Sequence, residues 1–205
     1  MQLQIGRSGT LLNTWTVDAG HSTAIRVGAV LFITAATAAA AQVAVPLGFT
    51  PVPLTLQDTM VLIGGAALGS RLGMAAQILY LAAGIAGLPV FAASATLPQG
   101  PMRLLGPTGG YLWSYPFAAF VVGDLAERGF DKRYLTSCLA MLAGLAVVMT
   151  FGVTWLALFA QPAALGLDAA LRLGLYPFLV NDVLKIVLGG ALLPGVWKLL
   201  GSYRT

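Results

Sequence analysis

An aspartate and a lysine stand three residues apart in an otherwise apolar stretch of the chain, YPFLVNDVLKIVLGG, residues 176–190. At positions i and i+3 of a helix, Asp182 and Lys185 share one face. A charged side chain in the middle of a transmembrane helix costs roughly 2.5–3.5 kcal/mol on insertion scales, so such residues usually face a protein interior or a wet cavity. The pair therefore predicts either a polar binding pocket or an internal ion pair that fixes helix packing.

Two other segments supply the polar and turn-forming residues that a pocket would need. The segment FTPVPLTLQD, residues 49–58, sets Thr55 and Gln57 among rigid prolines. The segment LLGPTGGYLWSY, residues 104–115, contains Gly109 and its neighbouring glycines, which let backbone N–H and C=O groups approach a ligand. Together with the charged pair, these loops favour a small-molecule site over a purely structural ion pair.

The elements that position these residues are predicted to lie in a membrane. The chain has 205 residues, of which 58% are hydrophobic and 9% charged, whereas a soluble domain carries roughly 25% charged residues. Its mean hydropathy is +0.86, and the long apolar runs do not alternate polar and apolar residues as barrel strands do. We therefore expect an all-α, polytopic membrane protein.

Six transmembrane helices are expected, and the rest of the chain forms short segments around them. The predicted spans cover residues 26–45, 56–70, 72–88, 108–123, 134–160 and 173–200. Residues 1–24 are expected to form a cytoplasmic N-terminal segment without a cleavable signal peptide, residues 25–200 the transmembrane domain, and residues 201–205 a cytoplasmic tail.

The distribution of basic residues predicts the orientation, because Lys and Arg accumulate in cytoplasmic loops. One set of segments holds eight basic residues: Arg7, Arg26, Arg71, Arg128, Lys132, Arg133, Lys198 and Arg204. The opposite loops hold only Arg103 and Arg172, and Lys185 is placed inside a span. Both termini are therefore expected in the cytoplasm.

Several functions are disfavoured by what the sequence lacks. The chain has no G-x-x-x-x-G-K-[ST] phosphate loop and a single histidine, His21, and no His, Cys and carboxylate residues stand at metal-ligand spacing. The basic residues are scattered, which argues against nucleic-acid binding. Binding or transport, with no metal or cofactor, is therefore expected rather than enzymatic catalysis.

Small residues at four-residue spacing indicate close contacts between helices. The pairs Ala35/Ala39 and Ala36/Ala40 lie in the first predicted span. Such a face packs either within the chain or against another membrane protein.

The segments VPLGFTPVPLTLQ, LLGPTGGYL and YPFLVNDVLK, in this order, resemble the BioY family. These proteins are the biotin-capturing membrane components, or S components, of energy-coupling factor (ECF) transporters. The string GPTGGYL, residues 106–112, is specific, and the resemblance covers nearly the whole chain from the first span onward. It implies a compact bundle of six helices with a biotin site near the outer face, capped by the loop between the first two helices.

The resemblance also implies which residues meet biotin. The pocket is expected to contain Asp182, Lys185, Tyr111, Gly109, Thr55, Gln57, Asn181 and Arg103. A carboxylate can accept the ureido N–H groups, and an ammonium can donate to the ureido carbonyl or meet the tail carboxylate. Lys185 could do either, and Arg103 competes with it for the tail. The family usually has PGD where this chain has Val180-Asn181-Asp182, so a more regular helix is expected around Asp182.

The partners implied by the resemblance are a transmembrane coupling protein and two cytoplasmic ATPases, within the lipid of the cytoplasmic membrane. Ala36 and Ala40 are then expected to dock on the coupling protein. The alternatives are an S component for another vitamin, a biotin transporter that works without dedicated ATPases, and a membrane-embedded enzyme acting on a lipid or isoprenoid.

Overall fold

The computed structural model describes residues 9–12, 22–94, 98–160 and 163–202. Within this part of the chain, six helices have twelve or more residues: α2 (Ser22–Gln42), α3 (Gln57–Leu68), α4 (Ser70–Ile85), α6 (Gly109–Glu127), α7 (Tyr134–Leu158) and α9 (Leu179–Ser202). Each one overlaps a predicted span, so the all-α prediction is confirmed. Most of the predicted segment 1–24 and residues 203–205 of the predicted tail lie outside the described residues.

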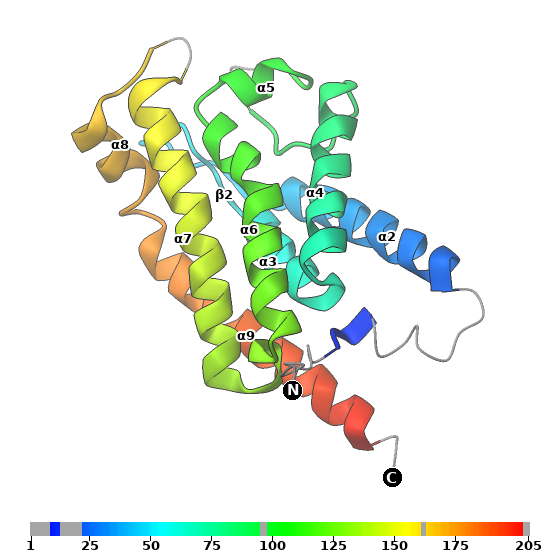
Figure 1. Cartoon of the computed structure of the whole chain (residues 1–205). Helices are drawn as coiled ribbons and strands as arrows, with labels where there is room; N and C mark the ends of the chain where they lie inside the picture. The colour runs from blue at the N-terminus through cyan, green and yellow to red at the C-terminus, as the bar shows by residue number, and fades with distance from the viewer. Residues whose placement is uncertain (1–8, 13–21, 95–97, 161–162, 203–205) are drawn as a thin grey trace, which may run out of the picture.

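Helix α6 lies in the middle of the bundle and packs against α3, α4 and α7 (Figure 1). Helix α2 packs on α3 and α4 at one side, and α9 crosses α7 and α3 at the other. Two short helices, α5 (Met102–Leu105) and α8 (Leu167–Gly174), lie at the same end of the bundle as the segment that follows α2.

Close helix contacts depend on two glycines, one within α3 and one directly after its end. A Cβ at Gly65 would stand 2.5 Å from the Ala119 carbonyl oxygen, so α3 and α6 could not approach as they do with any other residue there. Gly69 has φ +88°, which lets α3 end and α4 begin without a linker. The backbone N–H of Ser70 then donates to Glu127 Oε1 at 2.8 Å, so the end of α6 caps the start of α4.

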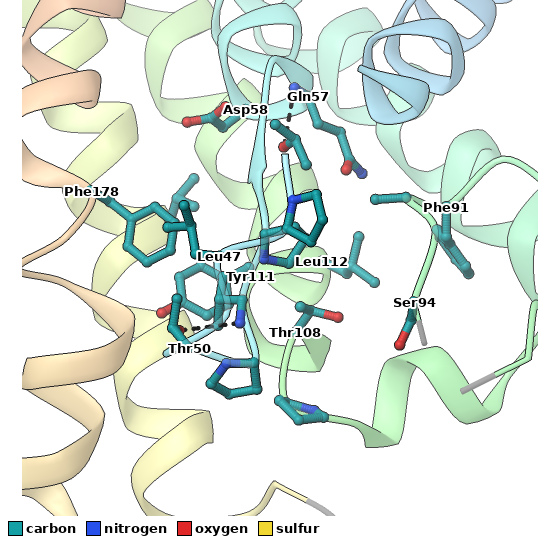
Figure 2. Close-up of a pocket in the computed structure, with 18 of the residues that line it drawn as sticks. Leu47, Thr50, Gln57, Asp58, Phe91, Ser94, Thr108, Tyr111, Leu112 and Phe178 are labelled. Atoms are coloured by element: carbon teal, nitrogen blue, oxygen red, sulfur yellow. Dashed lines mark hydrogen bonds between the residues drawn. The ribbon is translucent and has the colours of Figure 1, made fainter. Parts of the chain in front are cut away.

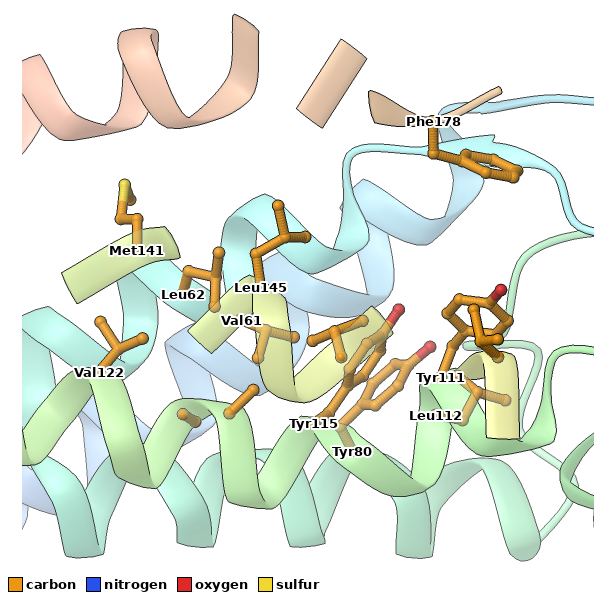
Figure 3. Close-up of a cluster of buried hydrophobic side chains, with 14 of the residues drawn as sticks. Val61, Leu62, Tyr80, Tyr111, Leu112, Tyr115, Val122, Met141, Leu145 and Phe178 are labelled. Atoms are coloured by element: carbon orange, nitrogen blue, oxygen red, sulfur yellow. The ribbon is translucent and has the colours of Figure 1, made fainter. Parts of the chain in front are cut away.

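The core runs along α6 between α3, α4 and α7. Figure 3 shows Tyr80, Tyr111 and Tyr115 toward the end where Phe178 lies, whereas Val122 and Met141 lie at the other end. These side chains are buried. The aromatic half of the core therefore borders the loops, and the aliphatic half fills the remainder of the bundle.

Large apolar side chains point outward from several helices. Phe32, Leu135 and Val180 are 70%, 74% and 84% exposed, which fits a surface in contact with lipid. Among the described residues, three helices are long and apolar enough to cross a bilayer, namely Thr23–Gln42, Tyr134–Leu158 and Leu179–Leu199. Helix α3 is shorter: its 12 residues extend about 18 Å, against about 30 Å for the hydrocarbon core.

The prediction of one helix over residues 173–200 is wrong at its beginning. Helix α8 ends at Gly174, residues 175–178 form turns, and α9 begins only at Leu179. The break is stabilised from outside, because the Thr50 and Tyr111 hydroxyls donate to the carbonyls of Leu173 and Gly174, at 2.6 and 2.7 Å. Asp182 consequently lies in the first turn of α9 and not in the middle of a helix.

The segment between α2 and α3 is more ordered than the proline-rich loop expected from the sequence. Strands β1 (Ala44–Val45) and β2 (Leu54–Thr55) form an antiparallel ribbon in which Ala44 pairs with Thr55. The ribbon presents residues 46–53 as the tip of a hairpin, and this tip covers the cavity described below.

The connection between α6 and α7 fixes the far end of α9. It contains a 3₁₀ helix, η1 (Phe130–Lys132), in which Asp131 is buried. The Trp197 indole Nε1–H donates to Asp131 Oδ2 at 2.6 Å, and Lys132 Nζ lies 5.1 Å from the centre of the Trp197 ring.

Candidate functional site

A cavity of about 310 Å³ lies under the hairpin tip, in the size range of small-molecule sites. Its walls come from the hairpin, the beginning of α3, the α4–α6 connection, α6, α7 and the beginning of α9. The lining residues are Pro46, Leu47, Thr50, Pro51, Val52, Pro53, Thr55, Gln57, Asp58, Phe91, Ala92, Ala93, Ser94, Arg103, Pro107, Thr108, Tyr111, Leu112, Tyr115, Val148, Met149, Phe178, Asp182 and Lys185. Figure 2 shows Gln57 and Asp58 at one end, with Thr50, Thr108 and Ser94 toward the other.

Two carboxylates and one ammonium meet at the α3 end of the cavity. Lys185 Nζ lies 2.9 Å from each carboxylate oxygen of Asp58, and 3.4 Å from Asp182 Oδ1. Asp58 and Asp182 are buried, at 7% and 2% exposure. The second oxygen of Asp182, Oδ2, is buried without a hydrogen-bond partner among the described residues. A buried acceptor of this kind is unusual unless a ligand or water completes it.

The two carboxylates meet because α3 and α9 begin side by side. Asp58 and Asp182 each stand in the first turn of their helix, where the exposed N–H groups and the helix dipole stabilise negative charge. Helix α3 has no side-chain cap at Leu56, and Asp58 is the acidic residue of its first turn. Lys185 then joins two segments that are 127 residues apart in sequence.

A second cation, Arg103, lies in the wall formed by the α4–α6 connection. Its side chain is buried, and Nη2 donates to the Ala92 carbonyl. Its Nε is buried without a partner, and no carboxylate pairs with the guanidinium among the described residues. Burial lowers the pKa of Arg103, as expected for a cation withdrawn from water. An anionic group in the cavity would supply the missing partner.

Aromatic residues and one amide complete the wall. Gln57 Nε2 donates to the Tyr80 hydroxyl, which in turn donates to the Val90 carbonyl at 3.1 Å. Tyr80 also contacts Phe91 edge-on, with ring centres 5.5 Å apart. The Tyr111 ring lines the cavity while its hydroxyl holds the end of α8. Leu47 and Leu112 lie between the two polar ends in Figure 2, and hydrogen bonds to neighbours hold Gln57 and Tyr111 in place.

The structure brings six of the eight predicted site residues to this cavity: Asp182, Lys185, Tyr111, Thr55, Gln57 and Arg103. Gly109 and Asn181 are not among the lining residues. A Cβ at Gly109 would stand 2.1 Å from the Leu104 carbonyl oxygen, so the glycine permits close packing of α6 on α5. Asn181 is partly exposed on α9 beside the buried Asp182.

The two alanines expected at a docking face differ in exposure. Ala40 is buried within the chain, at 8% exposure, and Ala36 is partly buried. Their neighbours Ala35 and Ala39 are the exposed pair on α2.

The sequence reasoning missed Asp58 and Phe178 as lining residues. The signal for Asp58 was present, since this carboxylate lies inside the short predicted span 56–70, just as Asp182 lies inside an apolar stretch. Phe178 gave no such signal, because it enters the cavity only through the turn between α8 and α9.

Comparisons with known proteins point to one family. A family model described as the BioY family matches residues 14–202. A probable biotin transporter BioY from Pyrococcus horikoshii is 41% identical over 159 residues, which cover 78% of this chain and 88% of the relative. A biotin transporter BioY from Thermotoga maritima is 35% identical over 154 residues, covering 75% and 85%.

One solved structure shows the same fold. The crystal structure of an S-component for biotin from an ECF-type ABC transporter superposes with a TM-score of 0.77. The match covers 88% of this chain and 94% of the other, at 24% identity. The helical arrangement is therefore that of a known membrane transport component.

Proposed function

The chain belongs to the BioY family, and we propose that it captures biotin in the cavity under the hairpin tip for uptake across the cytoplasmic membrane. The observation that carries the proposal is the polarity of the cavity. Asp182, whose Oδ2 has no hydrogen-bond partner among the described residues, lines its α3 end. Arg103, whose guanidinium pairs with no carboxylate in that part of the chain, lies in the wall of the α4–α6 connection. Biotin has the complementary groups, namely ureido N–H donors at one end and a carboxylate at the other.

The ureido ring fits the α3 end. Asp182 Oδ2 accepts a ureido N–H in a charge-assisted hydrogen bond, which satisfies its buried lone pairs. Apolar residues in the middle of the cavity, among them Leu112, Val148 and Phe178, suit the sulfur-containing ring and the aliphatic chain.

The tail carboxylate fits Arg103 better than Lys185. The Lys185 ammonium already has three acceptor oxygens within 3.4 Å, two of them from Asp58. Arg103 has no anionic partner in the described part of the chain, and its planar guanidinium suits a carboxylate. The longest of these contacts, the one to Asp182 at 3.4 Å, is the easiest to replace. In its place Lys185 can donate to the ureido carbonyl.

The proposed transport arrangement follows the family. Helices α2, α3, α4, α6, α7 and α9 are the six spans, and both termini face the cytoplasm. The chain is an S component that works with a transmembrane coupling protein and two ATPases. Helix α2 docks on the coupling protein through the small residues on its accessible side, Ala35, Ala36 and Ala39, whereas Ala40 packs within the chain.

Equilibrium binding to the purified full-length protein tests the function. Labelled biotin is expected to bind saturably, and riboflavin or thiamine in hundredfold excess is expected not to displace it. Displacement by either of them would assign the chain to another vitamin. Biotin uptake by cells with and without the coupling protein and ATPases then tests the partners, and equal uptake in both would indicate a transporter that works alone.

A further inference from the structure

Asp58 is the charged residue of the cavity to which the proposed contacts assign no ligand group. It contacts neither end of biotin in that arrangement, yet it makes the two shortest contacts of the charged cluster. This inference rests on the proposed function. We propose that Asp58 is a positioning residue, which holds the Lys185 ammonium away from Asp182. One Asp182 oxygen thereby stays free for the ligand.

The distances support this division of roles. Both Asp58 oxygens lie 2.9 Å from Lys185 Nζ, whereas the nearer Asp182 oxygen lies at 3.4 Å. An ammonium placed symmetrically between two carboxylates would contact both equally. Here Lys185 is drawn toward α3, although Asp182 is only three residues away on its own helix.

The formal charges lead to the same conclusion. The cluster contains two carboxylates and one ammonium, and Asp58 supplies the closer counter-charge for Lys185. Asp182 therefore keeps most of its negative charge directed at the ligand, and an ionised acceptor forms hydrogen bonds about twice as strong as a neutral one. Asp182 lines the cavity, and its Oδ2 is buried and has no partner among the described residues.

Removal of the Asp58 charge would leave Lys185 with a single anionic neighbour. A buried ammonium without its counter-ion is costly, so Lys185 would turn toward Asp182 and occupy the oxygen that the ureido N–H needs. Asp58→Asn is thus expected to weaken biotin binding about tenfold or more, which equals a loss of roughly 1.4 kcal/mol. The effect acts through Lys185 and should require it.

The test compares two ligands on a set of variants of the full chain. Dissociation constants for biotin and for biotinamide, whose tail is uncharged, are measured by calorimetry on the parent, Asp58→Asn, Lys185→Met, Asp58→Asn/Lys185→Met and Asp58→Glu. Asp168→Asn serves as the matched control, since Asp168 is an exposed carboxylate paired with Arg172 outside the cavity. Thermal melting of every variant reports on folding.

The expected result has three parts. Asp58→Asn weakens biotin and biotinamide by the same factor, because the change acts at the ureido end. In the Lys185→Met background the same exchange no longer weakens binding, because no ammonium is left to turn toward Asp182. Asp58→Glu, which retains the charge, and Asp168→Asn bind within a few-fold of the parent.

Three results would overturn the inference. The first is parent-like biotin affinity in Asp58→Asn, and the second is a change in the ratio between the two ligands, which would place Asp58 at the tail. The third is an equal loss in the presence and absence of Lys185. If Asp58→Asn does not fold, Asp58→Glu and the double variant decide, because replacing both members of a buried pair is tolerated better than removing one. A parent that does not bind biotin overturns the proposed function and the inference with it.

Discussion

Helix α9 meets a buried aspartate cluster at each end, and the two clusters share most of their chemistry. Near its beginning, Lys185 pairs with Asp58 and Asp182; near its end, Trp197 donates to Asp131. Each cluster contains one buried carboxylate oxygen without a partner among the described residues, Asp182 Oδ2 and Asp131 Oδ1. Each cluster also contains a cation: Lys185 pairs with Asp182, and Lys132 lies over the Trp197 ring.

The two clusters differ in access. The first borders the cavity under the hairpin, which Asp58, Asp182 and Lys185 line. The second borders neither this cavity nor the small hollow behind Lys185. An unpartnered buried oxygen is therefore not by itself a sign of a binding site, and the adjoining space decides between binding and fixing a helix end.

The largest effect is expected on biotin affinity, when one aspartate of each cluster is replaced by asparagine. Asp182→Asn replaces the charged acceptor for the ureido N–H, and we expect biotin affinity to fall about a hundredfold, equivalent to roughly 3 kcal/mol. Asp131→Asn should leave the affinity unchanged. Calorimetric titration of both variants checks this, and a comparable loss in Asp131→Asn would show that the comparison is wrong.

The next effect tests the other end of the cavity. Arg103→Met removes the guanidinium proposed to meet the tail, so biotin should bind about tenfold more weakly while biotinamide binding is nearly unchanged. Arg172→Met is the matched control, because Arg172 is exposed and pairs with Asp168. Equal losses for both ligands in Arg103→Met would place the tail elsewhere.

A smaller effect is expected on stability at the second cluster. Trp197→Phe keeps most of the ring but removes the 2.6 Å hydrogen bond to Asp131, which should cost about 1.5–3 kcal/mol because the acceptor is buried and charged. The melting temperature should fall while the dissociation constant for biotin stays the same. A change in biotin affinity without a change in melting would contradict the structural role of this contact.

The smallest effect concerns pH. Burial raises the pKa of Asp131, and the Trp197 hydrogen bond and the nearby Lys132 only partly oppose this. The folded carboxyl thus keeps its proton at a pH where the unfolded one, with a pKa of about 3.9, has lost it. Stability attributable to Asp131 should therefore fall as pH rises from about 4 through the folded-state pKa, and then level off. In Asp131→Asn the melting temperature should lose this component of its pH dependence.

The sequence predicted the helices well, because apolar runs bounded by polar or glycine-rich turns mark membrane helices. It did not locate the break between α8 and α9: Gly174 and Pro177 are a signal for it, but the apolar residues around them look like one continuous span. That break depends on hydroxyls from Thr50 and Tyr111, which reach α8 only in the folded bundle.

The candidate site was partly predictable for a similar reason. Asp182 and Lys185 are conspicuous in an apolar stretch, and the GPTGGYL string marks the segment around Tyr111. The partner of Lys185 was not predictable from spacing, because Asp58 is 127 residues away and the local i, i+3 pairing with Asp182 is the weaker contact. Sequence spacing identified a charged face but assigned Lys185 to Asp182, the carboxylate that is nearer in sequence but farther away in space.

An experimental structure of the full-length protein with biotin bound would show whether Asp182 receives the ureido ring. We expect a ureido nitrogen within about 2.7–3.2 Å of Asp182 Oδ2, with Lys185 still on Asp58 and the tail carboxylate at Arg103. Biotin bound outside the hairpin-covered cavity, or turned so that its carboxylate meets Lys185, would contradict this arrangement.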